Sequence, residues 1–310
     1  MKISRTIVCL LLMAILLTAR QVYAQTEARV ESPEPARATL SPFQAVALGF
    51  VEGVTEYLPV SSTGHLLIAV HLLGMDTTQR QKDAAESLAI CIQSGAILAV
   101  LVLYFGRIRQ IVAGMLGRNP EGLKLLFNLL VAFFPAAVIG LLFNKWIKAH
   151  LFGVIPVAIG LFVGGVLILA QSLFGMKQNQ DTGKELTQLS VRDALFVGIM
   201  QCLAFWPGFS RSLATILGCR WTGMRMMAAV EFSFLLGLVT LSAATAYEGL
   251  KHGKDMIADY GMTTPLIALF VAFVAAVVSV RFMVGALSKF GLSPFGYYRI
   301  LLALACLYWL

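Results

Sequence analysis

The amino-acid sequence predicts an all-α polytopic membrane protein, an inverted-topology repeat with six transmembrane helices and two re-entrant helical hairpins. Three observations carry this prediction. The 310 residues are 58% hydrophobic and only 13% charged, and that charged share is about half of what a soluble globular domain carries. Apolar runs of about 20 residues, enough to cross a bilayer, recur along the chain. Two further apolar regions are interrupted near the middle by proline, glycine and hydroxyl residues.

The first 40 residues differ from the rest of the chain. A basic amino end precedes an apolar stretch that closes with small residues at Ala24, so residues 1–24 resemble a secretory signal peptide. An uncleaved additional helix is the alternative interpretation. Residues 25–40 are polar, contain two prolines and carry both signs of charge, which predicts a disordered tail.

The rest of the chain divides into uninterrupted and interrupted apolar regions. The predicted spans are about 84–105, 122–144, 152–174, 226–247, 264–286 and 294–310. The interrupted regions, 42–74 and 191–222, are each predicted to form two half-helices joined by a turn, since proline removes a backbone donor and glycine loosens a helix. Non-helical backbone at membrane depth is tolerated only inside protein or along a wet cavity. We therefore expect both turns to face an internal pocket as re-entrant hairpins.

The two interrupted regions resemble each other at an offset of 149 residues. Leu40, Ser41, Ala45, Gly49 and Ser61 recur as Leu189, Ser190, Ala194, Gly198 and Ser210, while Glu52 falls on Gln201 and Ser62 on Arg211. Each region is followed by three predicted spans, and an odd number of spans per copy turns the second copy upside down. We thus predict repeat 1 at 41–175, a loop at 176–190 and repeat 2 at 191–310, with the hairpins meeting near the midplane.

The basic residues predict the orientation. The net charge is +8, and placing the mature amino terminus outside puts more Lys and Arg in the inner loops than in the outer ones, as the positive-inside rule requires. This predicts a multi-pass protein of the bacterial inner membrane. Nucleic-acid binding is not expected, because the basic residues are scattered over short loops rather than clustered. The five cysteines lie in apolar segments without ligand-type spacing, which predicts no disulfide framework and no zinc site.

Glu52 and Glu56 are the first candidate site residues. Four residues apart, they place two carboxylates on one face of the first half-helix. Like charges there repel unless a cation bridges them or one takes up a proton. A hard divalent cation such as Mg²⁺ or Ca²⁺, bound also to phosphate oxygens of a substrate, would satisfy both. A solvated helix face is the ordinary explanation of such a pair, but the neighbours Val51, Val54 and Leu58 are apolar.

A hydroxyl-rich turn follows, with Ser61, Ser62 and Thr63 just before His65. Backbone N–H groups at the start of the second half-helix would favour an anion. Ser62 could act as a nucleophile or a hydrogen-bond donor, and His65 as a general base. Alternatively, the serines cap the helix and His65 is a buried histidine bonded to a carbonyl.

The second interrupted region contributes Arg211, flanked by Ser210 and Ser212 and followed by Thr215. An arginine at bilayer depth needs an anionic partner, and its planar fork suits phosphate oxygens. Pairing with one of the two glutamates is the alternative. Both interpretations of Arg211 can hold if the substrate phosphate takes the place of the carboxylate when the substrate binds.

These stretches resemble the bacitracin-resistance (BacA/UppP) family, the undecaprenyl-diphosphatases of bacterial inner membranes. The resemblance runs from about residue 41 to the carboxyl terminus and rests on EGVTEYLPVSSTGH (52–65) and PGFSRSLAT (207–215), with VEFSFLLG (230–237) and PFGYYRI (294–300) as further matching stretches. It implies an inverted repeat with two re-entrant hairpins and a site facing the periplasm. It also implies hydrolysis of undecaprenyl diphosphate, which recycles the carrier lipid for cell-wall synthesis and confers bacitracin resistance.

The resemblance also implies residue roles. The catalytic candidates are Glu52, Glu56, Ser62, His65 and Arg211, the two glutamates doubling as metal ligands, and the substrate-binding candidates are Ser61, Thr63, Ser210, Ser212 and Thr215. The nucleophile stays open among Ser62, His65 and water. Leu213, Val239 and Ala303 depart from the residues usual in the family, but none of these positions is charged.

Two other functions share features with this sequence. A lipid-phosphate transporter or flippase is the alternative, because broken helices at the midplane are also a transporter design. A type-2 phosphatidic acid phosphatase is excluded, since Leu217 stands where that class has its nucleophilic histidine. Membrane lipids are expected partners, and a homo-oligomer is compatible with the sequence.

Overall fold

A computed structural model describes residues 39–173 and 183–309 of the chain. The signal-peptide-like segment predicted at 1–24 lies outside the described residues, as do residues 25–38 of the predicted tail and residues 176–182 of the predicted loop. Within the described ranges every regular element is a helix and no strand is present. The predicted all-α class is therefore confirmed for the part of the chain that the structure covers.

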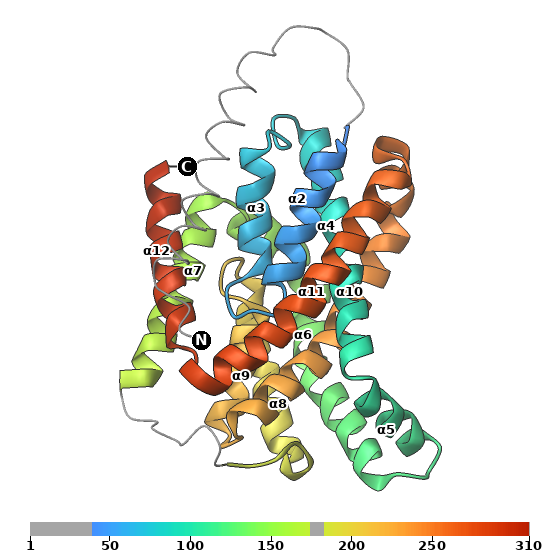
Figure 1. The fold of residues 1–310 in the computed structure, drawn as a ribbon, viewed down its shortest axis with the longest axis vertical. Coiled ribbons are helices and arrows are strands. Elements are labelled where there is room, and N and C mark those ends of the chain that lie inside the picture. Colours follow the sequence, from blue (N-terminus) through green and yellow to red (C-terminus); the bar gives the residue numbers. More distant parts are fainter. Residues whose placement is uncertain (1–38, 174–182, 310) are drawn as a thin grey trace, which may run out of the picture.

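The helices follow one another through short connections, and most of them run roughly along the long axis of the molecule (Figure 1). The elements are α2 (Pro42–Thr55), α3 (Ser62–Leu72), α4 (Gln79–Leu103), α5 (Phe105–Met115), α6 (Pro120–Leu151), α7 (Val154–Leu173), η1 (Leu186–Gln188), α8 (Val191–Gln201), η2 (Cys202–Phe205), α9 (Arg211–Trp221), α10 (Met226–Tyr260), α11 (Thr263–Phe290) and α12 (Ser293–Trp309).

Within the described residues, five helices are long and apolar enough to cross a membrane. They are Gln79–Leu103, Pro120–Phe143, Val154–Ser172, Met226–Tyr260 and Thr263–Phe290. These coincide with the first five predicted spans, and they indicate a multi-pass membrane protein. The sixth predicted span corresponds to α12, which does not belong to this group. Its 17 residues cover only about 26 Å at 1.5 Å per residue, less than a hydrocarbon core of about 30 Å.

Both predicted helix breaks are present. The first separates α2 from α3, and the second separates α8 and η2 from α9. In Figure 1, α2 and α3 occupy the upper half of the molecule and α8 and α9 the lower half, and the two turns meet near its mid-height. Two segments about 150 residues apart in the chain (offset 149) therefore face each other in the middle of the bundle.

The two turns are held in the same unusual backbone conformation. Ser61 and Ser210 precede α3 and α9 with φ angles of 74° and 80°, and they are the two non-glycine residues with positive φ in the described chain. Each side-chain oxygen accepts a hydrogen bond from the N–H three residues later, that of Gly64 or Leu213, at 3.3 Å. A left-handed backbone costs a serine about 1–3 kcal/mol, and each cap bond offsets part of that cost.

Other residues that recur at the offset of 149 also have matching structural roles. Ser41 and Ser190 both begin their helices with a capping box. Gly49 lies against the backbone of α11 and Gly198 against that of α6, where an added Cβ would stand 2.2 and 2.5 Å from a carbonyl oxygen. Glycine at both positions lets a broken helix approach a long one closely.

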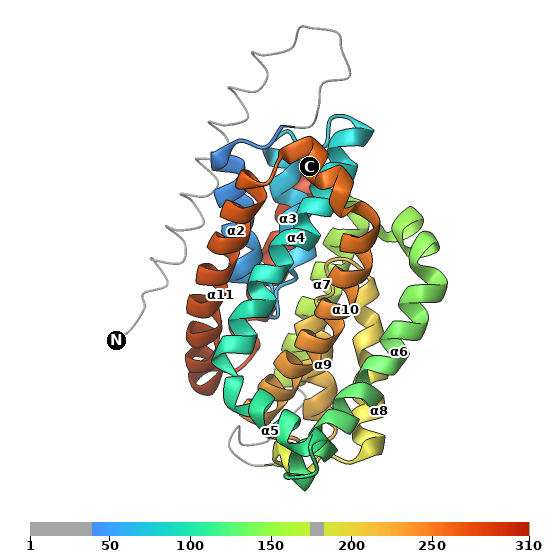
Figure 2. The same ribbon diagram turned by 90° about the vertical axis from the view of Figure 1, so that its right-hand side faces the viewer.

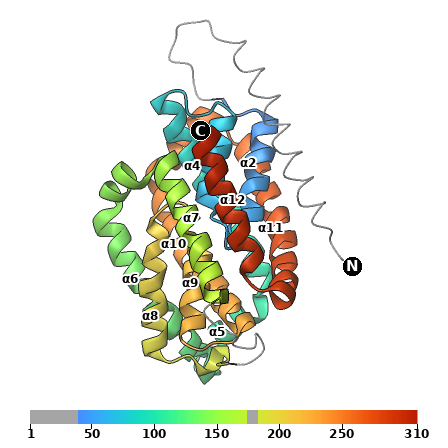
Figure 3. The ribbon, with the colours of Figure 1, turned by 90° about the vertical axis from the view of Figure 1, so that its left-hand side faces the viewer.

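The helix packing is reciprocal between the two halves of the chain. Helix α2 packs on α11, and α8 packs on α6. The first long helices of the halves, α4 and α10, pack on each other, and so do the third, α7 and α12, which lie side by side in Figure 3. Each broken helix thus packs on the second long helix of the other half.

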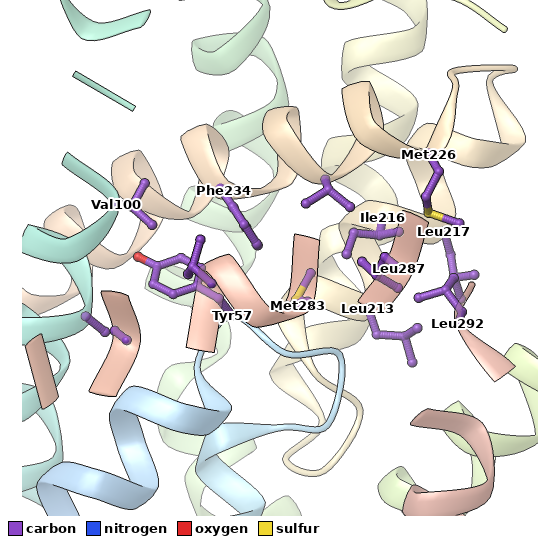
Figure 4. Close-up of a cluster of buried hydrophobic side chains, with 14 of the residues drawn as sticks. Tyr57, Val100, Leu213, Ile216, Leu217, Met226, Phe234, Met283, Leu287 and Leu292 are labelled. Atoms are coloured by element: carbon purple, nitrogen blue, oxygen red, sulfur yellow. The ribbon is translucent and has the colours of Figure 1, made fainter. Parts of the chain in front are cut away.

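The largest buried cluster surrounds the first turn. It joins α4, α9, α10 and α11 and includes Tyr57, Val100, Leu213, Ile216, Phe234 and Met283 (Figure 4). The Tyr57 ring meets the Phe234 ring edge-on, with ring centroids 5.0 Å apart. Since Tyr57 is fully buried and adjacent in sequence to Glu56, this packing anchors the backbone that carries one of the predicted site residues.

Candidate active site

The two turns meet at an ion pair between Glu56 and Arg211. Arg211 Nη2 donates to Glu56 Oε1 at 2.8 Å, and the two side chains are 12% and 4% exposed for Arg211 and Glu56. The Ser62 hydroxyl donates to the other carboxylate oxygen, Oε2. Of the two glutamates considered as partners for the arginine, the structure pairs it with Glu56. Three of the predicted catalytic residues are therefore in direct contact.

The position of Arg211 is set by α10 and by the aromatic ring next to Glu56. Its Nη1 donates to the Ser233 carbonyl at 3.1 Å, and its guanidinium carbon lies 5.5 Å from the centroid of the Tyr57 ring. Gly237 leaves the room that the guanidinium needs, because an added Cβ would stand 2.2 Å from Nη1. Nε is buried and has no hydrogen-bond partner within the described residues, so this arginine still has donor capacity for a ligand.

Glu52 lies one helical turn before Glu56 and is only 1% exposed. Neither of its carboxylate oxygens has a hydrogen-bond partner in the described part of the chain. Its charged neighbours are Glu56, which is also an acceptor, and Arg211. Burying an ionised carboxylate without a partner is costly. An orphaned carboxylate beside a second one is the arrangement that a bound cation would stabilise.

The donor set fits a hard cation shared with a substrate. No group of three or more His, Cys, Asp or Glu side chains that could hold a metal occurs within residues 39–173 and 183–309. Mg²⁺ commonly uses only one or two protein carboxylates when phosphate oxygens and water complete its shell. Glu52 and Glu56 match that requirement.

A cavity of about 470 Å³ opens next to the ion pair. Six of the predicted site residues line it, namely Glu56, Ser61, Ser62, Thr63, Ser210 and Arg211. Helices α3 and α9 begin at these residues, so their amino termini and first-turn N–H groups lie beside the same space. Two positive helix-dipole ends, hydroxyl groups and a guanidinium together form a good site for a multiply charged anion.

The rest of the cavity is mostly apolar, and its polar lining residues are Gln93, Gln201, Thr240, Tyr247 and Glu248. Its walls come mainly from α6, η2 and α10, with Ala137, Phe205 and Ala244 among the lining residues. Helix α6 carries Pro135 in its interior, where proline removes a helix hydrogen bond and bends the helix, and Figure 2 shows the far part of α6 standing away from α10. Leu141 lines the cavity and is 69% exposed, so the cavity reaches the outer surface of the bundle.

Two predicted substrate-binding residues lie behind the second turn and do not line the cavity. The Ser212 hydroxyl donates to the Leu58 carbonyl at 2.9 Å, which ties the second turn to the first. The Thr215 hydroxyl lies 2.6 Å from the Ser233 hydroxyl, which ties α9 to α10. In this structure both side chains support the turns rather than face the cavity.

His65 is also engaged away from the cavity. Its Nδ1 lies 2.7 Å from the Ser61 carbonyl oxygen and its Nε2 lies 2.6 Å from the Tyr298 hydroxyl. The two rings are stacked, with centroids 5.7 Å apart and an interplanar angle of 5°. This is the geometry of the alternative interpretation, a capped helix with a carbonyl-bonded histidine.

Comparison with known proteins assigns the chain to a family. The family described as Bacitracin resistance protein BacA matches residues 45–305, which include both turns and the cavity-lining helices. The chain belongs to the BacA family. The resemblance inferred from the sequence motifs is therefore confirmed.

Relatives of the BacA family are similar over most of their length. The undecaprenyl-diphosphatase of Sorangium cellulosum is 44% identical over 269 residues, which cover 86% of this chain and 86% of that protein. The undecaprenyl-diphosphatase 2 of Rhodospirillum rubrum is 42% identical over 264 residues, or 85% and 93%. The undecaprenyl-diphosphatase of Maridesulfovibrio salexigens is 40% identical over 268 residues, or 86% and 98%.

In this member of the BacA family, the structure also shows residues around the site that sequence reasoning did not single out. Tyr57 and Gly237 shape the surroundings of Arg211, and both lie inside stretches already noted for their resemblance. Arg299 is fully buried in α12. One signal could have found it, because a charged residue inside a predicted span is a functional-site hypothesis by default.

Proposed function

We propose that this protein is an integral membrane phosphatase that hydrolyses undecaprenyl diphosphate to undecaprenyl phosphate and inorganic phosphate. The observation that carries the proposal is a cavity with two chemically different parts. One end presents Arg211, hydroxyl groups and two helix amino termini, while the remaining walls are mostly apolar. A diphosphate fits the first part and a polyprenyl chain the second. The relatives described above are named undecaprenyl-diphosphatases.

In the proposed reaction, Arg211 stabilises the negative charge of the diphosphate and of the transition state. Such preorganised charge stabilisation is usually the largest contribution to phosphoryl transfer. When the diphosphate takes the place of a carboxylate beside Arg211, Glu56 is left with its hydrogen bond from Ser62. Glu56 is then positioned to accept a proton from Ser62, or from a water molecule in its place, as that oxygen attacks the terminal phosphorus and the bond to the bridging oxygen breaks, which releases undecaprenyl phosphate. If Ser62 attacks, water then hydrolyses the phosphoserine and releases inorganic phosphate.

We further propose that Glu52 and Glu56 hold a divalent cation, Mg²⁺ or Ca²⁺. The orphaned carboxylate of Glu52 and its closeness to Glu56 support this assignment. When bound, the cation would supply positive charge to the phosphate oxygens of the substrate. Glu52 and Glu56 would set its place relative to the first turn.

Phosphate release from undecaprenyl diphosphate by the purified protein in detergent tests the function. We expect release in the presence of Mg²⁺ or Ca²⁺, loss of at least 90% of it in EDTA, and recovery when the metal is restored. A protein that only transports lipid phosphates would release no phosphate under any of these conditions. Release that resists EDTA would overturn the cation assignment and leave the phosphatase assignment standing.

The reciprocal packing supports an inverted-topology repeat as the complete architecture. We infer that repeat 1 (41–175) and repeat 2 (191–310) each consist of one re-entrant hairpin and three spans, with α12 as the sixth span. The pairing of α4 with α10 and of α7 with α12, together with the exchange between α2–α11 and α8–α6, is the contact pattern of a two-fold related pair. The matched serine conformations in the two turns support the same inference.

We place the protein in the bacterial inner membrane with its cavity toward the periplasm. Tyr247 and Glu248 line the cavity at its far end, on the part of α10 that leads to the basic segment with Lys251 and Lys254. The orientation predicted from the Lys and Arg balance of all the loops puts the connection between α10 and α11 outside, although this connection carries two lysines of its own. An outward-facing cavity follows from that orientation. We expect the protein to bind undecaprenyl diphosphate there and to contact the surrounding membrane lipids.

Replacing Gly237 by alanine is expected to displace Arg211 without unfolding the protein. The added Cβ would stand 2.2 Å from Nη1, and the guanidinium can move because it ends a flexible side chain. Alanine is also a better helix former than glycine by about 1 kcal/mol. We expect kcat/KM to fall about 10- to 100-fold, as when one charge-stabilising contact is weakened, with Tm unchanged or higher.

The matched control for this variant is Gly249→Ala on the same helix. An added Cβ at Gly249 has no neighbour within 4 Å, so activity should stay at the level of the wild type. Equal activity of the two variants would show that the room beside Gly237 is irrelevant to the placement of Arg211.

A further inference from the structure

Arg299 is the largest fully buried side chain of the described residues, with 0% exposure. It lies on α12, and its guanidinium makes five hydrogen bonds, all to backbone carbonyl oxygens. The acceptors are Leu161 (3.3 Å, from Nε), Pro59 (3.0 Å, from Nη1), and Gly160 (3.1 Å), Gly208 (2.7 Å) and Phe209 (2.9 Å), these three from Nη2. No carboxylate pairs with it in the part of the chain described.

The five acceptors belong to three separate parts of the chain. Pro59 lies in the first turn, between α2 and α3, and Gly208 and Phe209 lie in the second turn, between η2 and α9. The other two acceptors are consecutive residues of α7. One guanidinium therefore connects both turns to each other and to α7. Arg299 itself does not line the cavity, and of its five acceptor residues only Gly208 does.

The surrounding backbone is built to admit this side chain. An added Cβ on Gly164 would stand 2.1 Å from Arg299 Nη2, and one on Gly208, where φ is +92°, would stand 2.2 Å from the Val157 carbonyl oxygen. The neighbouring Tyr298 holds His65 of the first half through its hydroxyl group. Consecutive residues of α12 thus engage α3 and both turns.

We propose that Arg299 is a positioning residue for the reaction. It holds the two turns at a fixed separation, so that Glu56 and Ser62 of the first turn face Arg211 of the second. The inference rests on the proposed function, because the quantity that it explains is the rate of diphosphate hydrolysis.

No other side chain could make the same set of contacts. The planar fork of arginine presents five donors in fixed directions, whereas lysine is a single compact charge with a different reach. The contacts on Nη1 and Nη2 are 2.7–3.1 Å long, within the normal range for N–H···O bonds. A misplacement of about 1 Å between reacting groups can cost roughly 100-fold in rate, so a small shift of either turn should be visible in kcat.

The test uses two variants that disturb the contacts in different ways. Arg299→Lys keeps the charge and loses the fork, whereas Gly164→Ala keeps Arg299 intact and pushes against its Nη2. We expect kcat for undecaprenyl diphosphate to fall at least 10-fold in both variants, with a smaller change in KM. A further variant, Arg299→Met, should be less active than Arg299→Lys.

The control variants are Arg220→Lys and Gly249→Ala. Arg220 is a buried residue of α9 that donates to the Met224 carbonyl. Both controls should stay within about twofold of the wild type.

A double-mutant cycle with Arg211→Lys separates positioning from a purely structural role. If Arg299 acts by placing the turns that carry Arg211 and Glu56, the loss caused by Arg299→Lys should be smaller in the Arg211→Lys background than in the wild type. Additive losses would overturn the proposal, and so would wild-type kcat per folded molecule in either variant, with folding followed by Tm and gel filtration. If the wild-type protein itself releases no phosphate, the proposed function fails and not this inference alone.

Discussion

Replacing Arg211 by lysine is expected to lower kcat/KM for undecaprenyl diphosphate by about 10²- to 10³-fold. Lysine keeps the positive charge but cannot contact Glu56 and the Ser233 carbonyl through a planar fork while also presenting donors to phosphate oxygens. Arg211→Ala should lower kcat/KM further, because this variant also leaves Glu56 buried without its cationic partner. Steady-state phosphate release in detergent, with Tm measured beside it, checks both variants.

Arg220→Lys is the matched control for this experiment. Arg220 lies on the same helix and is also buried, at 3% exposure, but it donates to the Met224 carbonyl and does not line the cavity. Its replacement should leave kcat/KM near the value of the wild type. If Arg211→Lys kept more than a tenth of the wild-type activity, Arg211 would not be the residue that binds the phosphate groups.

Glu52→Gln is expected to stabilise the cation-free protein and at the same time lower hydrolysis by at least about 100-fold. The Glu52 carboxylate is 1% exposed and unpartnered within the described residues, and an unsatisfied buried polar group costs about 1–3 kcal/mol, more when charged. An amide of similar shape removes the repulsion with Glu56 and can donate to it. The second repeat already carries an amide at the equivalent position, Gln201.

Activity should fall because an amide is a neutral and weaker ligand for a hard cation. Tm measured in EDTA should therefore be higher for Glu52→Gln than for the wild type, and Mg²⁺ should raise Tm less in the variant. Glu231→Gln is the control variant, for which we expect the opposite change in Tm. Glu231 is paired with Arg107 at 2.7 Å, so its replacement should lower Tm and leave hydrolysis in place. A Glu52→Gln protein that is less stable than the wild type in EDTA would show that the carboxylate has a partner in the cation-free state.

Much of the fold was predictable because its signals are local. The helix breaks follow from Pro59 and from Pro207-Gly208, since proline removes a backbone donor whatever surrounds it. The starts of α3 and α9 follow from serines that can cap a helix, and the spans follow from the length of apolar runs. The sixth span stays a prediction, because the 17 residues of α12 within the described chain are fewer than a full crossing requires.

The candidate site was predictable in its inventory and less so in its contacts. Buried charge is expensive in an apolar chain, so Glu52, Glu56 and Arg211 could be singled out from composition and spacing alone. Their partners could not be. The sequence left two glutamates open as partners of the arginine. It also left His65 open as a general base, whereas in the structure the imidazole lies against Tyr298, 233 residues away.

Short stretches of sequence are enough to predict where helices start, stop and break, and which side chains are too costly to bury without a function. These properties depend on backbone sterics and on the desolvation of single groups, and both act within a few residues. Which groups meet depends on the tertiary packing. The Glu56–Arg211 pair, the space that Gly237 leaves and the contacts of Arg299 with both turns all depend on how helices far apart in the chain pack against each other. That packing is a property of the whole bundle, and no short stretch of sequence records it.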